Sequence, residues 1–489
     1  LKDAFSITIN PMKNLVHRAS IIVLVLMLMT TFFQPGTVAA DSQGVLYTVQ
    51  SGDTLASIAQ AFHTTTARIM AINYFTDPNN LYPGRRVIIP GFEDVQGEVI
   101  RVTLPFGESL STYLKRTKQP LRLLERLNFI TNIDQAYAGA PVFKMYTEEI
   151  AVKDIPITAG LTGLELAVKQ DTSNWSLTVF NGLRGPWELI PNEMVFLPDD
   201  SEIAGVVVES TPILTVSPFP LLQGKTAQLI AAPIPEGATL GGILTLSIND
   251  SLGTSSNYQR TDFPLHFFAG EDGRLTALQG VHRFTKPGLV PMVLTTTYAD
   301  GATFSVQQNL VVNIQDYGQD APLVVDESFI DPDVTLPEWE MVKTYVQSAP
   351  PEKQWVFGFH SPSPTPDGWT SLYGRVRSYN DSDYIYFHSG IDYTGNYSTP
   401  IFAAADGDVV YVGDLDVRGG ATIISHGWGV YTGYWHQSQI DVKVGDHVTV
   451  GQTIGMVGDK GRVTGAHLHF EVFVGGVQVD PMDWLQGLY

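Results

Sequence analysis

The apolar positions of residues 47–90 change period along the segment. They alternate at its start, recur at helical spacing over 58–72, and close in a short run at 87–89, with turn residues between these stretches. This pattern predicts a short strand, two short helices and a closing strand within residues 46–91.

The same pattern recurs twice in weaker form, within residues 99–146 and 155–199. Asn73, Asn128 and Asn181 hold matching places in the three segments, at spacings of 55 and 53 residues. An internal repeat of this kind predicts three tandem modules, of which the second and third are degenerate.

Residues 205–314 read differently, as period-two apolar runs separated by Gly, Asn and Pro. Turn residues between such runs predict a β-sandwich of immunoglobulin-like type. No cluster of catalytic residue types stands out there, which favours a spacer or substrate-presenting role. Residues 315–356 are acidic and contain prolines, so we expect a linker with a short helix around 337–346.

Composition supports a mostly β protein of several domains. At 489 residues the chain is too long for one core, and 45 Gly and 30 Pro with only 16% charged residues suit loop-rich β domains. The net charge of -21 disfavours nucleic acid as a partner. Because there is no cysteine, any metal or catalytic site must use histidine and carboxylates.

Residues 12–40 have the composition of a secretory signal peptide. A basic start precedes the apolar run 21–29, and Val38-Ala39-Ala40 ends the segment before Asp41. We therefore expect export to the cell wall, the envelope or the medium. The alternative is an uncleaved membrane tether, although the apolar run is shorter than the roughly 20 residues that a membrane span needs.

Residues 46–91 resemble a LysM module, a βααβ unit that binds N-acetylglucosamine-containing glycans. The resemblance rests on the turn at 52–54, the helical stretch, Asn73 and the loop 81–84. It implies a glycan groove lined by Gly52, Asp53, Thr54, Leu81 and Tyr82. The two degenerate copies reproduce neither Asp53 nor the Leu-Tyr-Pro-Gly loop at 81–84, so for them a role as spacers is the better interpretation.

Candidate chemistry gathers in residues 357–489, which hold seven of the eleven histidines. In a strand over 467–472, alternation places His467, His469 and Glu471 on one face and apolar residues on the other. Two imidazoles side by side suit a metal ligand beside a proton-transfer group.

Each piece has an ordinary explanation when it is taken alone. A single His-x-His on a strand is more often a surface pair or a hydrogen-bonded core pair than a metal site. His388 and Asp392 have the spacing of one helix face, but Ser389-Gly390 between them argues against a helix. His436 alone indicates nothing.

The combination resembles the lysostaphin-like, or LytM-type, zinc endopeptidases, which cut peptidoglycan. The similarity covers roughly the last 130 residues. It rests on these stretches: 373–375, 388–392, 399–404, 407–410, 424–427, 434–436, 442–446, 451–455 and 465–471. It implies an antiparallel β peptidase domain over 357–489, with the active site in a groove on one sheet.

Carried over residue by residue, the resemblance implies one Zn²⁺ ion held by His388, Asp392 and His469. It makes His436 and His467 the catalytic pair, one accepting the proton of water and the other stabilising the oxyanion, with His467 favoured as the base. Glu471 is expected to form structural hydrogen bonds. The chain is thus predicted to be a peptidoglycan endopeptidase anchored to glycan. The alternative is a non-catalytic wall-binding protein or amidase activator.

Overall fold

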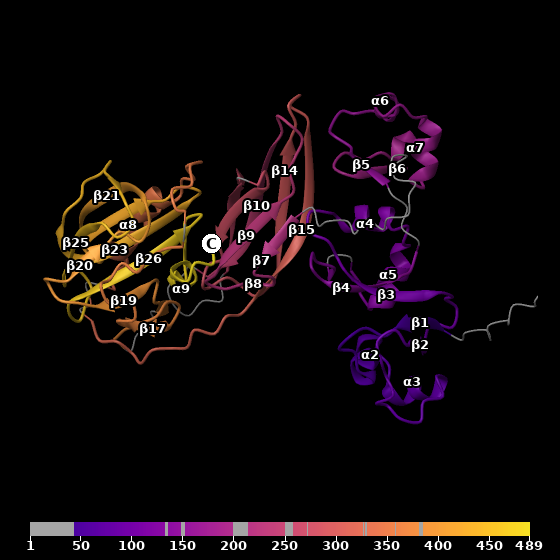
Figure 1. Cartoon of the computed structure of the whole chain (residues 1–489), viewed down its shortest axis with the longest axis horizontal. Coiled ribbons are helices and arrows are strands. Elements are labelled where there is room, and N and C mark those ends of the chain that lie inside the picture. Colours follow the sequence, from indigo (N-terminus) through magenta and orange to yellow (C-terminus); the bar gives the residue numbers. More distant parts are fainter. Residues whose placement is uncertain are drawn as a thin grey trace, which may run out of the picture. The chain divides into compact units, whose positions relative to one another are not determined.

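A computed structural model describes residues 44–132, 135–147, 152–198, 214–249, 258–270, 272–325, 327, 330–356, 358–380 and 385–489. The predicted export signal at 12–40 lies outside these residues. The prediction of a mostly β chain is confirmed (Figure 1). The chain divides into two compact units, Leu1–Ile100 with Phe143–Tyr146 and Arg101–Val142 with Thr147–Tyr489. None of the helices in the described part is long and apolar enough to cross a bilayer.

The first unit contains the predicted strand, two helices and strand. They are β1 (Val45–Thr48), α2 (Leu55–Ala61), α3 (Thr66–Ile72) and β2 (Arg86–Ile89). β1 and β2 pair antiparallel. Thr54 and Thr65 cap the two helices, because each hydroxyl accepts a hydrogen bond from a backbone N–H in the first turn.

Two further strand-helix-helix-strand groups follow in sequence. The first consists of β3 (Glu98–Thr103), α4 (Leu110–Arg116), α5 (Leu121–Asn128) and β4 (Pro141–Met145). The second consists of β5 (Val152–Pro156), α6 (Gly163–Lys169), α7 (Asn174–Phe180), η2 (Pro186–Glu188) and β6 (Met194–Pro198). Residues 143–146 belong to the first unit, where the Phe143 ring packs 4.3 Å from that of Phe62.

The repeated asparagines have a structural role. The Asn73 side-chain amide donates to Ile69 O and Ile88 O, and its oxygen accepts from Ile88 N, all at 2.7–2.8 Å. Asn181 makes the same bonds to Leu177 and Phe196. Asn73 and Asn181 therefore tie the end of the second helix to the closing strand, which explains their matching places in the sequence.

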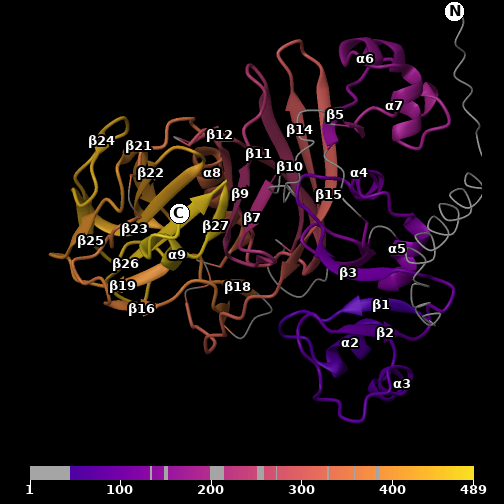
Figure 2. The ribbon, with the colours of Figure 1, turned by 45° about the vertical axis from the view of Figure 1, so that its right-hand side comes forward.

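Two sheets form a sandwich over residues 214–313. Its strands are β7 (Leu214–Ser217), β8 (Leu221–Leu222), β9 (Thr226–Ala231), β10 (Thr239–Ile248), β11 (Gln259–His266), β12 (Phe268–Ala269), β13 (Leu275–Gly280), β14 (Gly288–Thr297) and β15 (Thr303–Asn313). One sheet has the order β11-β10-β14-β15-β8 and the other β12-β13-β9-β7 (Figure 2). Leu229 of one sheet and Met292 of the other belong to the same buried core. The immunoglobulin-like type of the sandwich remains a prediction.

The C-terminal domain is built on a ten-stranded sheet whose main order is β16-β19-β26-β23-β22-β21-β24. Its elements are α8 (Pro332–Val346), β16 (Trp369–Ser371), β17 (Val376–Ser378), β18 (Ile385–Phe387), β19 (Ile391–Thr394), β20 (Pro400–Phe402), β21 (Gly407–Leu415), β22 (Gly419–Ser425), β23 (Val430–Ile440), β24 (His447–Val448), β25 (Thr453–Val457), β26 (His467–Val474), β27 (Val477–Val479) and α9 (Pro481–Leu485). β17 and β18 form a separate hairpin.

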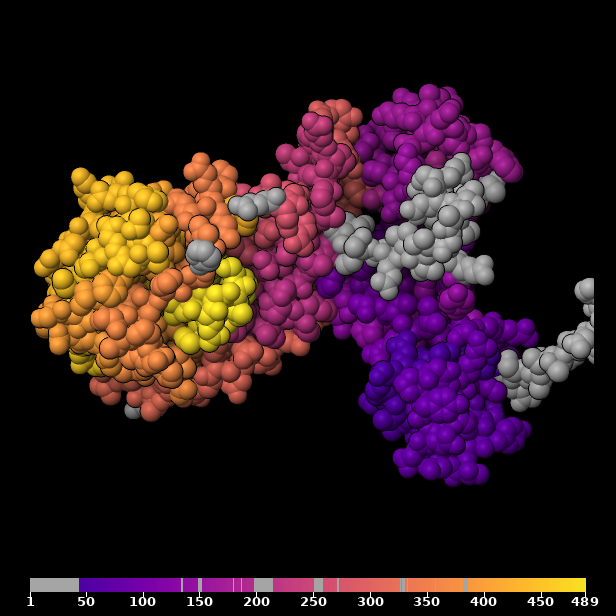
Figure 3. Space-filling model, in the orientation of Figure 1, coloured from indigo at the N-terminus to yellow at the C-terminus, as the bar shows by residue number. Residues whose placement is uncertain are grey.

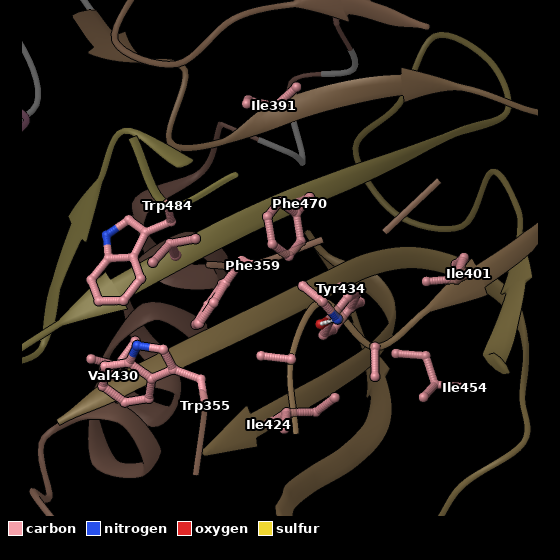
Figure 4. Close-up of a cluster of buried hydrophobic side chains, with 14 of the residues drawn as sticks. Trp355, Phe359, Ile391, Ile401, Ile424, Val430, Tyr434, Ile454, Phe470 and Trp484 are labelled. Carbon is pink, nitrogen blue, oxygen red and sulfur yellow. Dashed lines mark hydrogen bonds between the residues drawn. The ribbon is translucent and has the colours of Figure 1, made fainter. Parts of the chain in front are cut away.

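The two faces of this sheet differ in what covers them. Leu468, Phe470 and Val472 of β26 enter the main core, which Figure 4 shows together with Tyr434 and Trp484. On the other face, α8 packs Val342 and Val346 against Trp435 and Phe473. The alternation predicted for β26 is therefore confirmed, and His469 shares its face of the strand with Phe473 and not with the main core.

The C-terminal residues pack against the sandwich (Figure 3). The Trp484 Nε1 donates to the Thr226 hydroxyl at 3.1 Å, and the Tyr489 hydroxyl donates to Thr226 O at 2.9 Å. The Lys225 ammonium lies 2.9 Å from Asp480 and 2.8 Å from Asp483. These contacts join the sandwich and the C-terminal domain within the second compact unit.

Candidate metal centre and active site

Strand register brings two of the predicted ligands together. Asp392 of β19 stands opposite His469 of β26, and Thr394 stands opposite His467. Residues that face each other across neighbouring strands project from the same side of the sheet. His388 reaches this place from the turn between β18 and β19, where Gly390 is packed so closely against Phe470 O that a Cβ would lie 2.1 Å from it.

Three ligand atoms converge on one point. His388 Nε2 lies 2.9 Å from Asp392 Oδ1 and 3.0 Å from His469 Nδ1, and the last two atoms are 2.6 Å apart. Among the residues that the structure describes, His388, Asp392 and His469 have ligand atoms close enough together to hold one metal ion. It consists of the three residues that the sequence resemblance implies.

Hydrogen bonds on the outer side of the rings select their tautomers. His388 Nδ1 donates to Leu372 O at 2.8 Å, which leaves Nε2 with its lone pair toward the centre. His469 is reversed, because its Nε2 lies 3.2 Å from Glu471 Oε1 and its Nδ1 faces the centre. A carbonyl or carboxylate partner of this kind orients a ligating imidazole and raises its basicity.

Glu471 has the structural role that was expected. It is 1% exposed, and its Oε1 also accepts from the Ser389 hydroxyl and from Gln478 Nε2 at 2.9 Å. Burial raises the pKa of Glu471, but hydrogen bonds from His469 and Ser389 and the charge of Arg418 outweigh it and lower the pKa to about 2. Glu471 is therefore an ionised anchor for His469 at any physiological pH.

His436 faces the site because the backbone of β23 is bent there. Tyr434 points into the main core, and simple alternation would send His436 the same way. His436 instead has φ of 64°, in the left-handed region that costs a non-glycine residue about 1 kcal/mol. Its ring consequently lies 4.9 Å from His467 and 6.1 Å from His469.

The Nδ1 atoms of His436 and His467 both form hydrogen bonds. His436 Nδ1 donates to Lys460 O and His467 Nδ1 donates to Gly465 O, each at 2.8 Å. His467 Nε2 is 3.7 Å from Asp392 Oδ1. In their neutral forms, both rings therefore keep an unprotonated Nε2 beside the ligand cluster.

The electrostatics of the site favour neutral His388 and His436 beside an ionised carboxylate. His469 differs, because burial lowers its pKa but the hydrogen bonds with Asp392 and Glu471 outweigh burial and raise it. Burial lowers the pKa of His388, and burial together with His467 and His469 holds the pKa of His436 well below its usual range. Burial opposes ionisation of Asp392, yet the contacts with His388 and His469 hold the pKa of that carboxyl well below its usual range.

Two arginines near the site, Arg377 and Arg418, belong to none of the motifs found in the sequence. Arg377 Nη2 lies 3.6 Å from Asp392 Oδ2. Arg418 Nη1 donates to Glu338 Oε1 of α8 at 2.9 Å, and Arg418 O accepts from His436 N at 2.8 Å. Arg375 and Arg377 are two residues apart, so in a strand both side chains lie on one face. This spacing is the sequence signal that could have indicated Arg377.

The five residues predicted to line a glycan groove occupy two loops of the first unit. Gly52 has φ of 89° in the turn before α2. Asp53 Oδ2 accepts from the Tyr47 hydroxyl at 2.7 Å and from Gln50 N at 2.8 Å, so this carboxylate shapes the turn. In the second loop, Leu81 is half-buried and Tyr82 is exposed.

Comparison with known proteins matches two segments of the chain to known domains. Residues 386–481 match peptidase family M23, and residues 47–90 match the LysM domain. Peptidoglycan DD-endopeptidase ShyA of Vibrio cholerae serotype O1 is 42% identical over 95 residues, which are 19% of this chain and 22% of the relative. DD-carboxypeptidase/endopeptidase Mpg of Neisseria meningitidis serogroup B has the same identity and coverage. The chain thus spans about a fifth of the length of these curated relatives.

Among solved structures, the catalytic domain of the prophage-encoded M23 protein EnpA from Enterococcus faecalis is 34% identical. The match covers 25% of this chain and 95% of that chain, with a TM-score of 0.23. The family matches therefore place a peptidase family M23 domain at residues 386–481 and a LysM domain at residues 47–90 of this chain.

Proposed function

We propose that this chain is an exported zinc metalloendopeptidase that hydrolyses stem or cross-bridge peptide bonds of bacterial peptidoglycan. The observation that carries the proposal is the convergence of His388, Asp392 and His469 beside two further imidazoles. The names of the relatives, a peptidoglycan DD-endopeptidase and a DD-carboxypeptidase/endopeptidase, support the substrate class. The cell wall or envelope is then the place of action.

The donor set fits one zinc ion. Two imidazole nitrogens and one carboxylate oxygen are ligands that zinc accepts, and three protein ligands leave a fourth position free, as a catalytic site requires. The outer hydrogen bonds of His388 and His469 are those of an oriented zinc site. When bound, zinc supplies Lewis acidity, which polarises the scissile carbonyl and makes water easier to deprotonate.

His467 is assigned as the general base. Its Nε2 accepts the proton of the attacking water and then donates that proton to the leaving amine. Asp392 Oδ1, 3.7 Å from this nitrogen, stabilises the positive charge that the ring gains. Within the described residues, His436 makes no such ion pair with a carboxylate.

His436 is assigned to the oxyanion. Its Nδ1–H is held by Lys460 O, so only Nε2 faces the reaction. The lowered pKa of His436 keeps the ring neutral in the free site. When substrate is bound, Nε2 takes one proton from solvent, and this N–H donates a hydrogen bond to the carbonyl oxygen as negative charge develops there. The proton returns to solvent when the carbonyl re-forms.

The LysM domain holds the enzyme on glycan. Tyr82 and Leu81 offer apolar surface for a sugar ring, while Gly52, Asp53 and Thr54 form the opposite loop. Tethering raises the effective concentration of peptide substrate, so a modest glycan affinity is sufficient. The two degenerate groups are assigned a spacer role.

The test is release of new amino groups from purified peptidoglycan by the purified chain, with and without a zinc chelator. Release that stops with chelator and returns with added zinc is the expected result. If the chain binds wall and zinc but releases no amine, the non-catalytic alternative, a wall-binding protein or amidase activator, replaces this proposal.

A further inference from the structure

The segment after the sandwich pairs with the edge of the C-terminal domain. We call residues 318–323 the strap. Val376 N donates to Gly318 O at 3.1 Å, Asp320 N donates to Val376 O at 2.9 Å, and Leu323 N donates to Ser378 O at 2.9 Å. The strap therefore runs parallel to β17 along the lower edge of the domain in Figure 1, and its backbone is fixed there.

The strap presents one carboxylate to two arginines. Arg375 Nε donates to Asp320 Oδ1, and Arg377 Nε donates to Asp320 Oδ2 at 3.1 Å. Burial raises the pKa of Asp320, but the hydrogen bonds from both arginines outweigh it and lower the pKa. Asp320 is thus charged at neutral pH and holds both guanidinium groups.

Of these two arginines, Arg377 reaches the ligand cluster. Arg377 Nη2 donates to the Ser371 hydroxyl at 2.8 Å and lies 3.6 Å from Asp392 Oδ2. The Ser371 hydroxyl is in turn 3.1 Å from His388 Nδ1. Arg377 therefore contacts one ligand directly and the other through Ser371, both on the side away from the convergent point.

This arrangement separates the two oxygens of Asp392. Oδ2 faces the guanidinium, while Oδ1 lies within 3 Å of both ligand imidazoles. A carboxylate with one oxygen engaged in this way offers the other oxygen in a fixed direction. The orientation of Asp392 then depends on where Asp320 holds Arg377.

We propose that Asp320 and Arg377 are positioning residues for the metal centre, so that the strap completes the active site from outside the segment that matches the family. The inference rests on the metal site of the proposed function. Outer partners of metal ligands typically change metal affinity by about 10–100-fold when they are replaced. Residues 315–356, predicted as a linker, would thus contribute a carboxylate on which zinc binding depends.

The test compares zinc affinity among full-length variants, measured by competition with a chromophoric chelator. Arg377→Gln and Asp320→Asn should each bind zinc about 10–100-fold more weakly than wild type. Asp320→Glu, which keeps the charge, should recover part of the loss. Arg375→Gln is the matched control, because the Arg375 guanidinium binds Asp320 and Gln319 O and not a ligand, and its zinc affinity should stay within about threefold.

Urea unfolding of the metal-free proteins separates positioning from loss of fold. Weaker zinc binding with an unchanged free energy of unfolding supports positioning. A zinc affinity of Arg377→Gln equal to that of wild type would overturn the proposal, and so would an equal loss of affinity in Arg375→Gln. If Asp320→Asn does not fold, the affinity of Arg377→Gln decides the test. A wild type that binds zinc yet releases no amine would end the proposed function but leave this comparison intact, whereas a wild type that binds no zinc would end both.

Discussion

Asp392 and His469 stand directly opposite each other on β19 and β26, with Asp392 Oδ1 2.6 Å from His469 Nδ1. Because side chains alternate along a strand, a slip of one residue would turn His469 into the core and bring Leu468 to the site. The buried side chains of Leu468 and Phe470 oppose such a slip, since burying each contributes about 1.5–3 kcal/mol. The core packing of β26 therefore also sets the geometry of the proposed metal centre.

Removing a ligand should separate catalysis from anchoring. His469→Ala should lose zinc binding and lower amine release by at least about 100-fold, because two ligands hold zinc far more weakly than three. Binding to insoluble peptidoglycan should not change. His447→Ala, at an exposed histidine paired with Asp408, is the control and should behave as wild type. Loss of wall binding in His469→Ala would refute the division of labour.

The outer partner of His469 should tune the metal site without being a ligand. Glu471→Gln keeps the size of the side chain but removes the charge that accepts from His469 Nε2. Zinc affinity, measured by chelator competition, should fall by about 10–100-fold. An unchanged affinity would mean that the bond between Glu471 and His469 does not orient the ring.

Helix α8 should contribute stability through one buried ion pair. Glu338 is 8% exposed and accepts from Val417 N at 2.7 Å and from Arg418 Nη1 at 2.9 Å. Glu338→Gln should lower the free energy of unfolding by about 3–5 kcal/mol, because the buried Arg418 guanidinium loses its hydrogen-bonded carboxylate. Glu340→Gln, at an exposed position of the same helix, should change it by less than about 0.5 kcal/mol in the same urea titration.

Two histidines outside the proposed ligand set, the buried His426 and the partly buried His282, should make the fold sensitive to acid. Burial lowers the pKa of His282 and of His426 to about 4, so both are neutral in the folded protein. Below about pH 6.5 the unfolded chain binds protons that the folded chain does not, so stability is complete above pH 6.5 and falls as the pH drops toward 4.

Each of these histidines should remove up to about 3 kcal/mol of stability across that range. Urea unfolding at pH 7, 5.5 and 4.5 measures the decline. His282→Gln has no proton to bind and should show a shallower one. An equal slope in wild type and variant would contradict the assignment for His282.

An exposed tyrosine should carry part of the wall affinity. Tyr82 is 57% exposed in the loop proposed to line the glycan groove. Tyr82→Ala should weaken binding to insoluble peptidoglycan several-fold, since stacking surface for the sugar is lost, and should leave hydrolysis of soluble peptide fragments unchanged. Tyr74→Ala removes a tyrosine that is 91% exposed in the same domain and serves as the control. Equal losses in both variants would argue against a defined groove.

Local patterns in the sequence predicted a large share of this architecture. The period of two in 467–472 predicted which side of β26 carries the histidines, and the spacing of Asn73 and Asn181 marked equivalent closing strands. The resemblance to the peptidase family then named the three ligands that the structure brings together. Strand faces and repeated groups can be predicted from the sequence because they depend on residues that are close together in the chain or on short repeats.

The sequence by itself therefore determined the strand faces, the repeated helix-strand groups and the identity of the converging side chains. Only the tertiary structure decided how they are held. The left-handed backbone at His436 turns that ring toward the site against simple alternation, and Asp320 reaches Arg377 across 57 positions of the chain. Contacts between distant segments leave no local period in the sequence, because their energy depends on packing that exists only after the chain has folded.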